Sequence, residues 1–216
     1  MKIIDAAKDL KKPTNKEVLA IIEELYEKAS HEEQHLLALL YRHFLPNKKA
    51  GSVKTAFDWV AKAVAGPKEQ ITKPQFQYVY ATGQEIVATN SHILFLAPDD
   101  REAGYYHPVT GDKVDETGEY PDFKRLFPDS VTGFKEVGEF DRFETFMGKP
   151  GAVVGAMLDN NPDDIIWIQT DYYKKLCCFG DPLMVRTKDN SSMIICYFGD
   201  GRKALVMPVR SGKVGS

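Results

Sequence analysis

One stretch of the sequence has the spacing of a catalytic metal site. His31 and His35 lie one helical turn apart, and Glu32 follows the first of them, which gives the pattern H-E-x-x-H. In zinc proteases with this pattern the two histidines bind the metal, and the glutamate acts as a general base on the metal-bound water. The pattern therefore raises the hypothesis of a zinc hydrolase.

The surrounding residues favour a different interpretation. Ser30 and Glu33 form a capping box, which places the stretch in the first turn of a helix, whereas zinc-protease histidines lie in mid-helix. The third ligand of the extended signature would fall at Tyr41. A solvated helix start, whose carboxylates interact favourably with the helix dipole, explains the residues better. We keep the zinc hydrolase as a lesser alternative, and we expect a protein that is not an enzyme and needs no metal or cofactor.

Composition sets further bounds. The chain has 216 residues, a net charge of -3 and 43% hydrophobic residues, as expected for one globular domain with a small appendage. This charge does not exclude nucleic-acid binding, because phosphate contacts need only a local basic face. The cysteine count of three is odd, and Cys177 and Cys178 are adjacent, which favours reduced thiols. With no signal peptide and no apolar run near about 20 residues, we expect a cytoplasmic protein without a membrane partner.

Hydrophobic periodicity predicts an α+β protein. Residues 1–49 are predicted to be helical, with capping boxes that begin at Thr14 and Ser30, and Ser52 is predicted to cap a further helix that ends at Ala65. After Pro74 apolar residues alternate as in strands. Strands are expected in 76–80, 85–97, 152–158, 165–168, 183–187, 193–198 and 204–209, a loop in 98–119, and a helix capped by Asp171 in 172–179. We divide the chain into a helical segment (1–49), a domain (50–211) and a flexible tail (212–216).

Three stretches of this domain carry a family resemblance. They are ATNSHILFLA at 88–97, YPDFKRLFP at 120–128 and ALVMPVR at 204–210. Each resembles a signature of the bacterial DNA polymerase sliding clamp, which the family writes as ATDGHRLA, FPDYRRVxP and VMPxR, and the three occur in the family's order. The resemblance implies one sliding-clamp-like domain made of two halves, each a helix plus antiparallel strands. We interpret the chain as a compact single-domain variant encoded by a phage, in which case it would act in the host cytoplasm.

In the family these segments surround a hydrophobic pocket that binds short peptides of polymerases and repair proteins. By resemblance, the partner-binding residues here would be Thr89, His92, Ile93, Leu94, Pro121, Arg125, Leu126, Val206, Met207, Pro208 and Val209. For the apolar members, simple core packing is an equally good interpretation. The family's Asp-Gly-His-Arg is replaced by residues 90–93, Asn-Ser-His-Ile. We expect the lost glycine to change the turn, and the lost arginine to remove either a cation from the pocket rim or a contact with DNA.

DNA would be held by basic side chains on helices and loops. Lys54 and Lys62 are eight residues apart and would share one helical face. The predicted DNA-binding residues are Lys48, Lys49, Lys54, Lys62, Lys174, Lys175, Arg202, Lys203 and Arg210, with Lys213 nearby, and Tyr105, Tyr106, Tyr172 and Tyr173 could stack on unpaired bases. Ordinary solvated surface is the competing interpretation for scattered lysines.

These observations predict a non-catalytic accessory protein that holds single-stranded or duplex DNA. It would recruit a DNA or RNA polymerase subunit in replication or transcription, and homo-oligomers would be needed to encircle DNA. The main alternative is a phage transcription cofactor that binds single-stranded DNA without forming a ring.

Overall fold

A computed structural model describes residues 53–66, 73–115 and 118–210, together with the single positions Ile21, Leu25 and Val214. Several predictions lie outside these residues. They are the helical segment with its two capping boxes, the H-E-x-x-H pattern, the cap at Ser52, most of the tail, and Lys48, Lys49 and Lys213.

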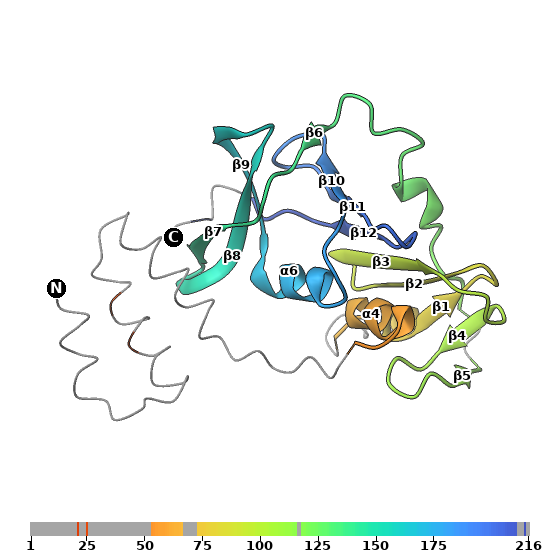
Figure 1. Ribbon diagram of the computed structural model, residues 1–216. Coiled ribbons are helices and arrows are strands. Elements are labelled where there is room, and N and C mark those ends of the chain that lie inside the picture. The colour runs from red at the N-terminus through yellow and green to blue at the C-terminus, as the bar shows by residue number, and fades with distance from the viewer. Residues whose placement is uncertain are drawn as a thin grey trace.

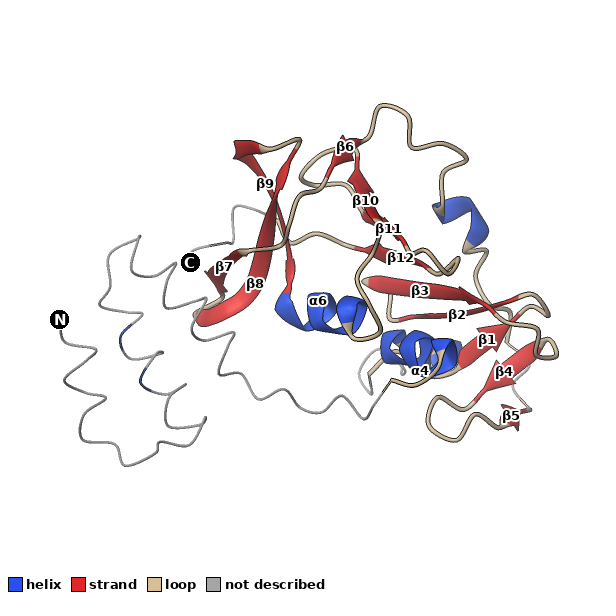
Figure 2. Cartoon of the chain, in the orientation of Figure 1, coloured by secondary structure: helices blue, strands red, loops and turns tan. Residues whose placement is uncertain are grey.

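The described part of the chain is mostly antiparallel sheet (Figures 1 and 2). A nine-stranded sheet has the order β5 (Lys113–Val114), β4 (Gly104–Tyr106), β1 (Val79–Ala81), β2 (Glu85–Thr89), β3 (Ile93–Pro98), β12 (Lys203–Val206), β11 (Ile194–Tyr197), β10 (Met184–Thr187) and β6 (Lys135–Glu136). A second sheet contains β7 (Arg142–Phe146), β8 (Lys149–Leu158) and β9 (Asn161–Gln169). The helices are α4 (Ala56–Val60) and α6 (Thr170–Cys177), with 3-10 turns at Ala61–Ala63, Pro74–Gln77 and Lys124–Leu126. None of these helices is long and apolar enough to cross a membrane.

Both faces of the large sheet are buried. On β3 the side chains of Ile93, Phe95 and Ala97 enter one core, and those of Leu94 and Leu96 enter a second core. This split follows from the alternation of side chains along a strand. The first core also contains the buried residues of α4 and α6, so it is called here the helix-side core. The second contains an aromatic cluster and is called the aromatic-side core.

The helices α4 and α6 lie side by side against the sheets (Figure 1). The helix α4 packs on β2 and β3, and α6 packs on β8 and β9. Trp59 joins the two helices, since its indole Nε1 donates a hydrogen bond of 3.0 Å to the carbonyl oxygen of Leu176. The same indole stacks on Phe95 of β3 with ring centroids 4.3 Å apart. One buried side chain thus holds both helices to the large sheet.

The first described helix is shorter than the sequence pattern predicts. Its cap is Thr55, whose side chain accepts from the Asp58 backbone while the Asp58 carboxylate accepts from the Thr55 backbone. The α-helix ends at Val60 and continues as a 3-10 turn. Lys54 precedes the cap, so the prediction that it shares one face of a continuous helix with Lys62 is wrong.

Other boundaries also differ from prediction. The apolar run 85–97 is interrupted by a turn at 90–92 and forms the hairpin β2–β3, and the predicted loop at 98–119 contains the short strands β4 and β5. The helix predicted to start at Tyr172 begins at Thr170, with Gln169 as its cap and Asp171 in its first turn. The strands predicted after residue 150 are present, with ends shifted by a few residues.

Candidate partner-binding pocket

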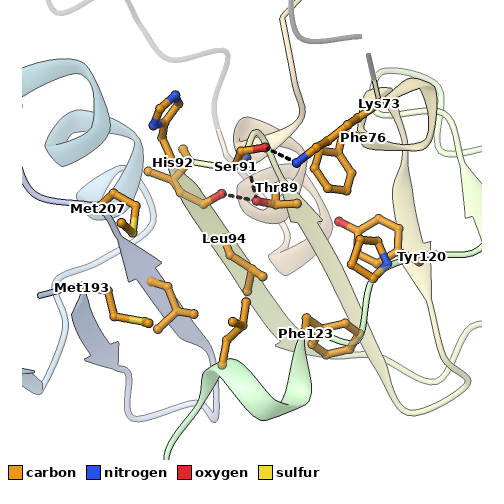
Figure 3. A pocket seen from close by; sticks show the side chains of 14 residues that line it. Lys73, Phe76, Thr89, Ser91, His92, Leu94, Tyr120, Phe123, Met193 and Met207 are labelled. Carbon is orange, nitrogen blue, oxygen red and sulfur yellow. Dashed lines mark hydrogen bonds between the residues drawn. The ribbon is translucent and has the colours of Figure 1, made fainter. Parts of the chain in front are cut away.

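A pocket of about 300 Å³ opens on the aromatic side of the large sheet (Figure 3). It lies where the β2–β3 hairpin, the segment 120–126 and the end of β12 meet. Its lining residues are Lys73, Phe76, Thr89, Ser91, His92, Ile93, Leu94, Tyr120, Pro121, Phe123, Leu126, Met193, Leu205 and Met207. The surface is mainly apolar, which is usual for a site that binds a small molecule or a short peptide.

Side-chain hydrogen bonds shape the turn between β2 and β3. The Asn90 Oδ1 atom accepts from the backbone nitrogens of His92, at 3.0 Å, and Ile93, at 2.9 Å. The Thr89 hydroxyl donates to the Ile93 carbonyl oxygen at 2.7 Å. Ser91 adopts a φ of 75°, the left-handed conformation that glycine adopts without steric cost. Ser91 thus takes up a left-handed conformation without being a glycine, and the expected change of the turn relative to the family stays a prediction.

The end of β12 is fixed to this turn. Val206 pairs with Ile93 in the sheet, and the Met207 backbone nitrogen donates to the His92 carbonyl oxygen at 2.8 Å. Since side chains alternate, Val206 is fully buried in the helix-side core, whereas Leu205 and Met207 line the pocket. The Met207 side chain is 45% exposed, so it is available for contact.

The segment 120–126 forms another wall. Tyr120 and Phe123 are buried in the aromatic-side core, and they anchor the 3-10 turn that carries Leu126, which is 43% exposed. The Tyr120 ring stacks on the Tyr80 ring with centroids 4.9 Å apart and an interplanar angle of 6°. Burial raises the pKa of the Tyr120 phenol, so the hydroxyl stays protonated and can donate a hydrogen bond.

The pocket wall contains basic side chains but no acidic one among its described residues. Lys73 and His92 line it, and none of the described lining residues is an aspartate or a glutamate. The Lys73 ammonium hydrogen-bonds the Ser91 hydroxyl at 3.3 Å and lies 5.0 Å from the centroid of the Phe76 ring. The wall therefore favours ligands that carry hydrogen-bond acceptors or negative charge.

The structure separates the predicted partner-binding residues into two groups. Those that line the pocket are Thr89, His92, Ile93, Leu94, Pro121, Leu126 and Met207. The others are outside its lining: Val206 is buried, Pro208 is half-buried, and exposed Arg125 lies 3.6 Å from the Asp122 carboxylate. The Val209 nitrogen donates to the Trp167 carbonyl oxygen in β9, at 2.7 Å, which draws Val209 toward the second sheet.

Sequence reasoning missed several lining residues. Three of them, Tyr120, Phe123 and Leu205, lie inside the motif segments. Their aromatic or apolar side chains are equally typical of a core, so the sequence does not indicate that they contact a ligand. Lys73, Phe76 and Met193 come from segments without any motif, so only tertiary contacts bring them to the pocket.

The predicted DNA-binding residues are also dispersed. Lys54 and Lys174 are exposed, and Lys62 and Lys175 are half-buried, all of them on or next to α4 and α6. Burial raises the pKa of the Cys178 thiol, and the positive charge of Lys62 has a smaller, lowering effect on it. Lys62 therefore lies near Cys178, which directly follows α6. These four lysines are called here the helix-face lysines.

Three further predicted cations lie elsewhere. Lys203 is half-buried, with its ammonium 5.7 Å from the Phe127 ring centroid on the aromatic side, and Arg210 is exposed beyond β12. Arg202 is 6% exposed, and its guanidinium donates to Asp200 at 2.7 Å and to the Phe179 carbonyl oxygen at 2.9 Å. The prediction that Arg202 binds DNA is corrected, because a buried guanidinium that packs on three aromatic rings is a structural group.

No reactive centre is apparent in the described part of the chain. Burial raises the pKa of the Cys177 thiol to about 12, and it also raises the pKa values of Cys178 and Cys196, so their nucleophilic thiolate forms are disfavoured. The described residues contain no cluster of three or more His, Cys, Asp or Glu side chains that could hold a metal. The H-E-x-x-H pattern lies outside them.

Comparison with solved structures finds chains similar to this one among bacterial sliding clamps. The DNA polymerase sliding clamp of Bacillus subtilis is 15% identical with a TM-score of 0.49, over 75% of this chain and 63% of that chain. The clamp of Pseudomonas aeruginosa is 15% identical with a TM-score of 0.48, over 76% of this chain and 65% of that chain. The Helicobacter pylori beta clamp bound to a DNA ligase peptide is 11% identical with a TM-score of 0.46, over 72% and 62%.

This chain therefore spans less than two thirds of the length of each of these clamps. No family model matches the sequence, and no curated protein matches it.

Proposed function

We propose that this protein is a non-catalytic, sliding-clamp-like accessory protein that holds DNA and recruits a polymerase subunit. The observation that carries the proposal is the meeting of three clamp-like motifs, far apart in sequence, around one pocket. Leu94, Leu126 and Met207 belong to the three different motifs, and all of them line it. Motif residues that line the same pocket support a common role in binding a partner. Motif residues buried at separate places in the core would not support it.

The pocket suits a short peptide of the partner. Leu126 and Met207 expose nearly half of their surface at the rim, while Leu94 and Phe123 provide a buried floor. A few apolar side chains of a peptide can be anchored on such a surface and supply most of the binding energy. The flexible thioether of Met207 can adapt to different ligand shapes.

DNA is proposed to bind on the other side of the large sheet, across α4 and α6. The helix-face lysines lie on this layer, and the Trp59–Leu176 hydrogen bond holds the two helices together. The division into two clamp-like halves belongs to the same proposal, with α4 and the large sheet in one half and α6 and the β7–β9 sheet in the other. One domain cannot enclose a duplex, so encirclement would need several copies.

A specific observation favours the single-stranded alternative. Tyr172 and Tyr173 are half-buried on α6, directly before the exposed Lys174, so aromatic and cationic groups are adjacent. Unpaired bases stack on such aromatic groups while lysines contact the phosphates. Tyr105 and Tyr106, which were predicted to take part, are only 4% and 8% exposed, and this part of the prediction is corrected.

The proposal is tested by titrating the full chain with matched single-stranded and double-stranded oligonucleotides at two salt concentrations. A mass measurement in solution accompanies each titration. Salt-sensitive binding to duplex by an oligomer supports the clamp-like mode, and salt-sensitive binding to single strands by a monomer supports the transcription cofactor. Failure to bind either nucleic acid at low salt contradicts both modes.

A further inference from the structure

The pocket contains a buried hydrogen-bond donor without a partner among the described residues. The Tyr120 hydroxyl oxygen is closed to solvent and makes no hydrogen bond with any of them. Figure 3 shows this hydroxyl turned toward the other lining side chains. Leaving a buried hydroxyl unpaired costs on the order of 1–3 kcal/mol. The presence of an unpaired hydroxyl at this position therefore requires an explanation.

Lys73 continues the same wall. Its ammonium lies 5.0 Å from the centroid of the Phe76 ring, and that ring lies 5.8 Å from the Tyr120 ring. Lys73 is exposed, and one hydrogen bond of 3.3 Å ties its ammonium to the Ser91 hydroxyl. The lysine, the phenylalanine and the tyrosine therefore form a continuous strip with a cation at its outer end and a phenolic donor at its inner end.

We infer that this strip recognises a carboxylate side chain next to the apolar anchors of the partner peptide, so that the pocket selects an acidic apolar segment. The inference rests on the proposed peptide-binding function and adds to it the chemistry of the partner. The carboxylate binds the Lys73 ammonium, and when the Phe76 ring turns aside it also accepts from the Tyr120 hydroxyl.

Two features of the pocket support this choice of occupant. Its described lining offers cationic and neutral donors but no carboxylate, so an acidic peptide meets no like charge in the wall. Met193 and Met207 lie away from Lys73 and leave room for the apolar side chains of the same segment (Figure 3).

The test uses fluorescent heptapeptides with blocked ends, so that they differ only in their side chains. One set has two leucines and one aspartate between serine and glycine residues, in each of the three orders. The second set replaces aspartate by asparagine, and the third replaces both leucines by serine. Fluorescence anisotropy measures binding to the full chain and to the variants Tyr120→Phe and Lys73→Gln.

Matched controls are available in the same chain. Tyr80→Phe removes a hydroxyl from the aromatic neighbour of Tyr120, and Tyr80 is outside the pocket lining. Lys188→Gln removes a lysine that also lies over a phenylalanine, 5.6 Å from the Phe134 ring centroid, again outside the lining. Thermal unfolding of each variant separates a loss of binding from a loss of fold.

We expect at least one aspartate peptide to bind about tenfold more tightly than its asparagine counterpart, as a charge-assisted hydrogen bond allows. Tyr120→Phe and Lys73→Gln should each remove most of this preference, while the two controls keep it. Tyr120→Phe should unfold at the same or a higher temperature than the parent, since it removes an unpaired buried hydroxyl.

Two negative results have different meanings. If leucine peptides bind but aspartate and asparagine are equivalent, or if Tyr120→Phe and Lys73→Gln keep the preference, the inference is overturned and the peptide pocket stands. If leucine peptides bind no better than serine peptides, the pocket does not anchor apolar side chains, and the proposed recruitment function fails with it.

Discussion

The indole nitrogen of Trp59 donates a hydrogen bond to the carbonyl oxygen of Leu176 across 117 positions of sequence, at 3.0 Å. The donor belongs to α4 and the acceptor to α6, and both residues are buried. This bond also satisfies a carbonyl in the last turn of α6, where the helix itself cannot supply a donor. The relative position of the helix-face lysines therefore depends on one buried side chain.

Replacing Trp59 by phenylalanine should destabilise the protein by about 2–4 kcal/mol. The change leaves the Leu176 carbonyl unpaired and removes ring volume that packs on Phe95. Urea denaturation followed by circular dichroism measures the free energy of unfolding. Phe179→Leu is a useful comparison, because Phe179 is only half-buried. A loss below about 0.5 kcal/mol for Trp59→Phe would show that the bond does not hold the helices together.

The helix-face lysines should control DNA affinity. Neutralising Lys54 with Lys62, or Lys174 with Lys175, should weaken binding and reduce the salt slope by about 0.7–0.9 for each lost phosphate contact. Affinity is measured at several salt concentrations by fluorescence anisotropy. The double variant Lys124→Gln with Lys188→Gln provides a control of equal charge on the aromatic side. Unchanged affinity in both helix-face variants would exclude α4 and α6 as the DNA site.

Met207→Ala and Leu126→Ala should each weaken binding of a polymerase subunit by about 1–4 kcal/mol while leaving DNA affinity nearly intact. Their exposures of 45% and 43% limit the cavity that truncation creates, so the unfolding temperature should fall only slightly. Leu183→Ala is the matched control, because Leu183 is 80% exposed and outside the pocket lining. A folded Met207→Ala protein that binds the subunit as tightly as the parent would contradict the recruitment role.

Ser91→Gly should stabilise the turn between β2 and β3 by about 0.5–1 kcal/mol. A non-glycine residue at a φ of 75° pays a steric cost, and the gain is reduced by the greater freedom of glycine in the unfolded chain. Ser91→Ala should not stabilise the protein, since it removes the hydroxyl and retains the strained backbone. Thermal unfolding compares the three proteins. Equal stability of the glycine and alanine variants would show that the turn carries no strain.

Local patterns in the sequence predicted several elements well. The strands after residue 150 and the second described helix are close to their predicted positions, because alternation and helical spacing are local properties. The first described helix was predicted too long. Apolar residues continue to Ala65, but the Thr55–Asp58 capping box sets the start, and a 3-10 turn follows Val60. Element boundaries depend on such local hydrogen bonds more than on composition.

The tertiary structure decided which residues belong to the site. The three motifs in the sequence indicated Leu94, Leu126 and Met207 as candidate site residues, and all three line the pocket. The same motifs also indicated Val206, which is as apolar as its neighbours but is fully buried. Both faces of the large sheet are covered, so the strands are continuous apolar runs that do not reveal which face opens into a pocket. Long-range packing makes that choice.

The sequence by itself determined the apolar character of the strands and of the three motif segments, and the number of basic side chains. Only the tertiary structure decided that Arg202 is enclosed by aromatic rings, and that Lys73 and Tyr120 meet in one wall. The physical reason is that burial and donor satisfaction depend on groups far apart in the chain. A lysine or a tyrosine has the same local signature whether it faces solvent, a core or a ligand.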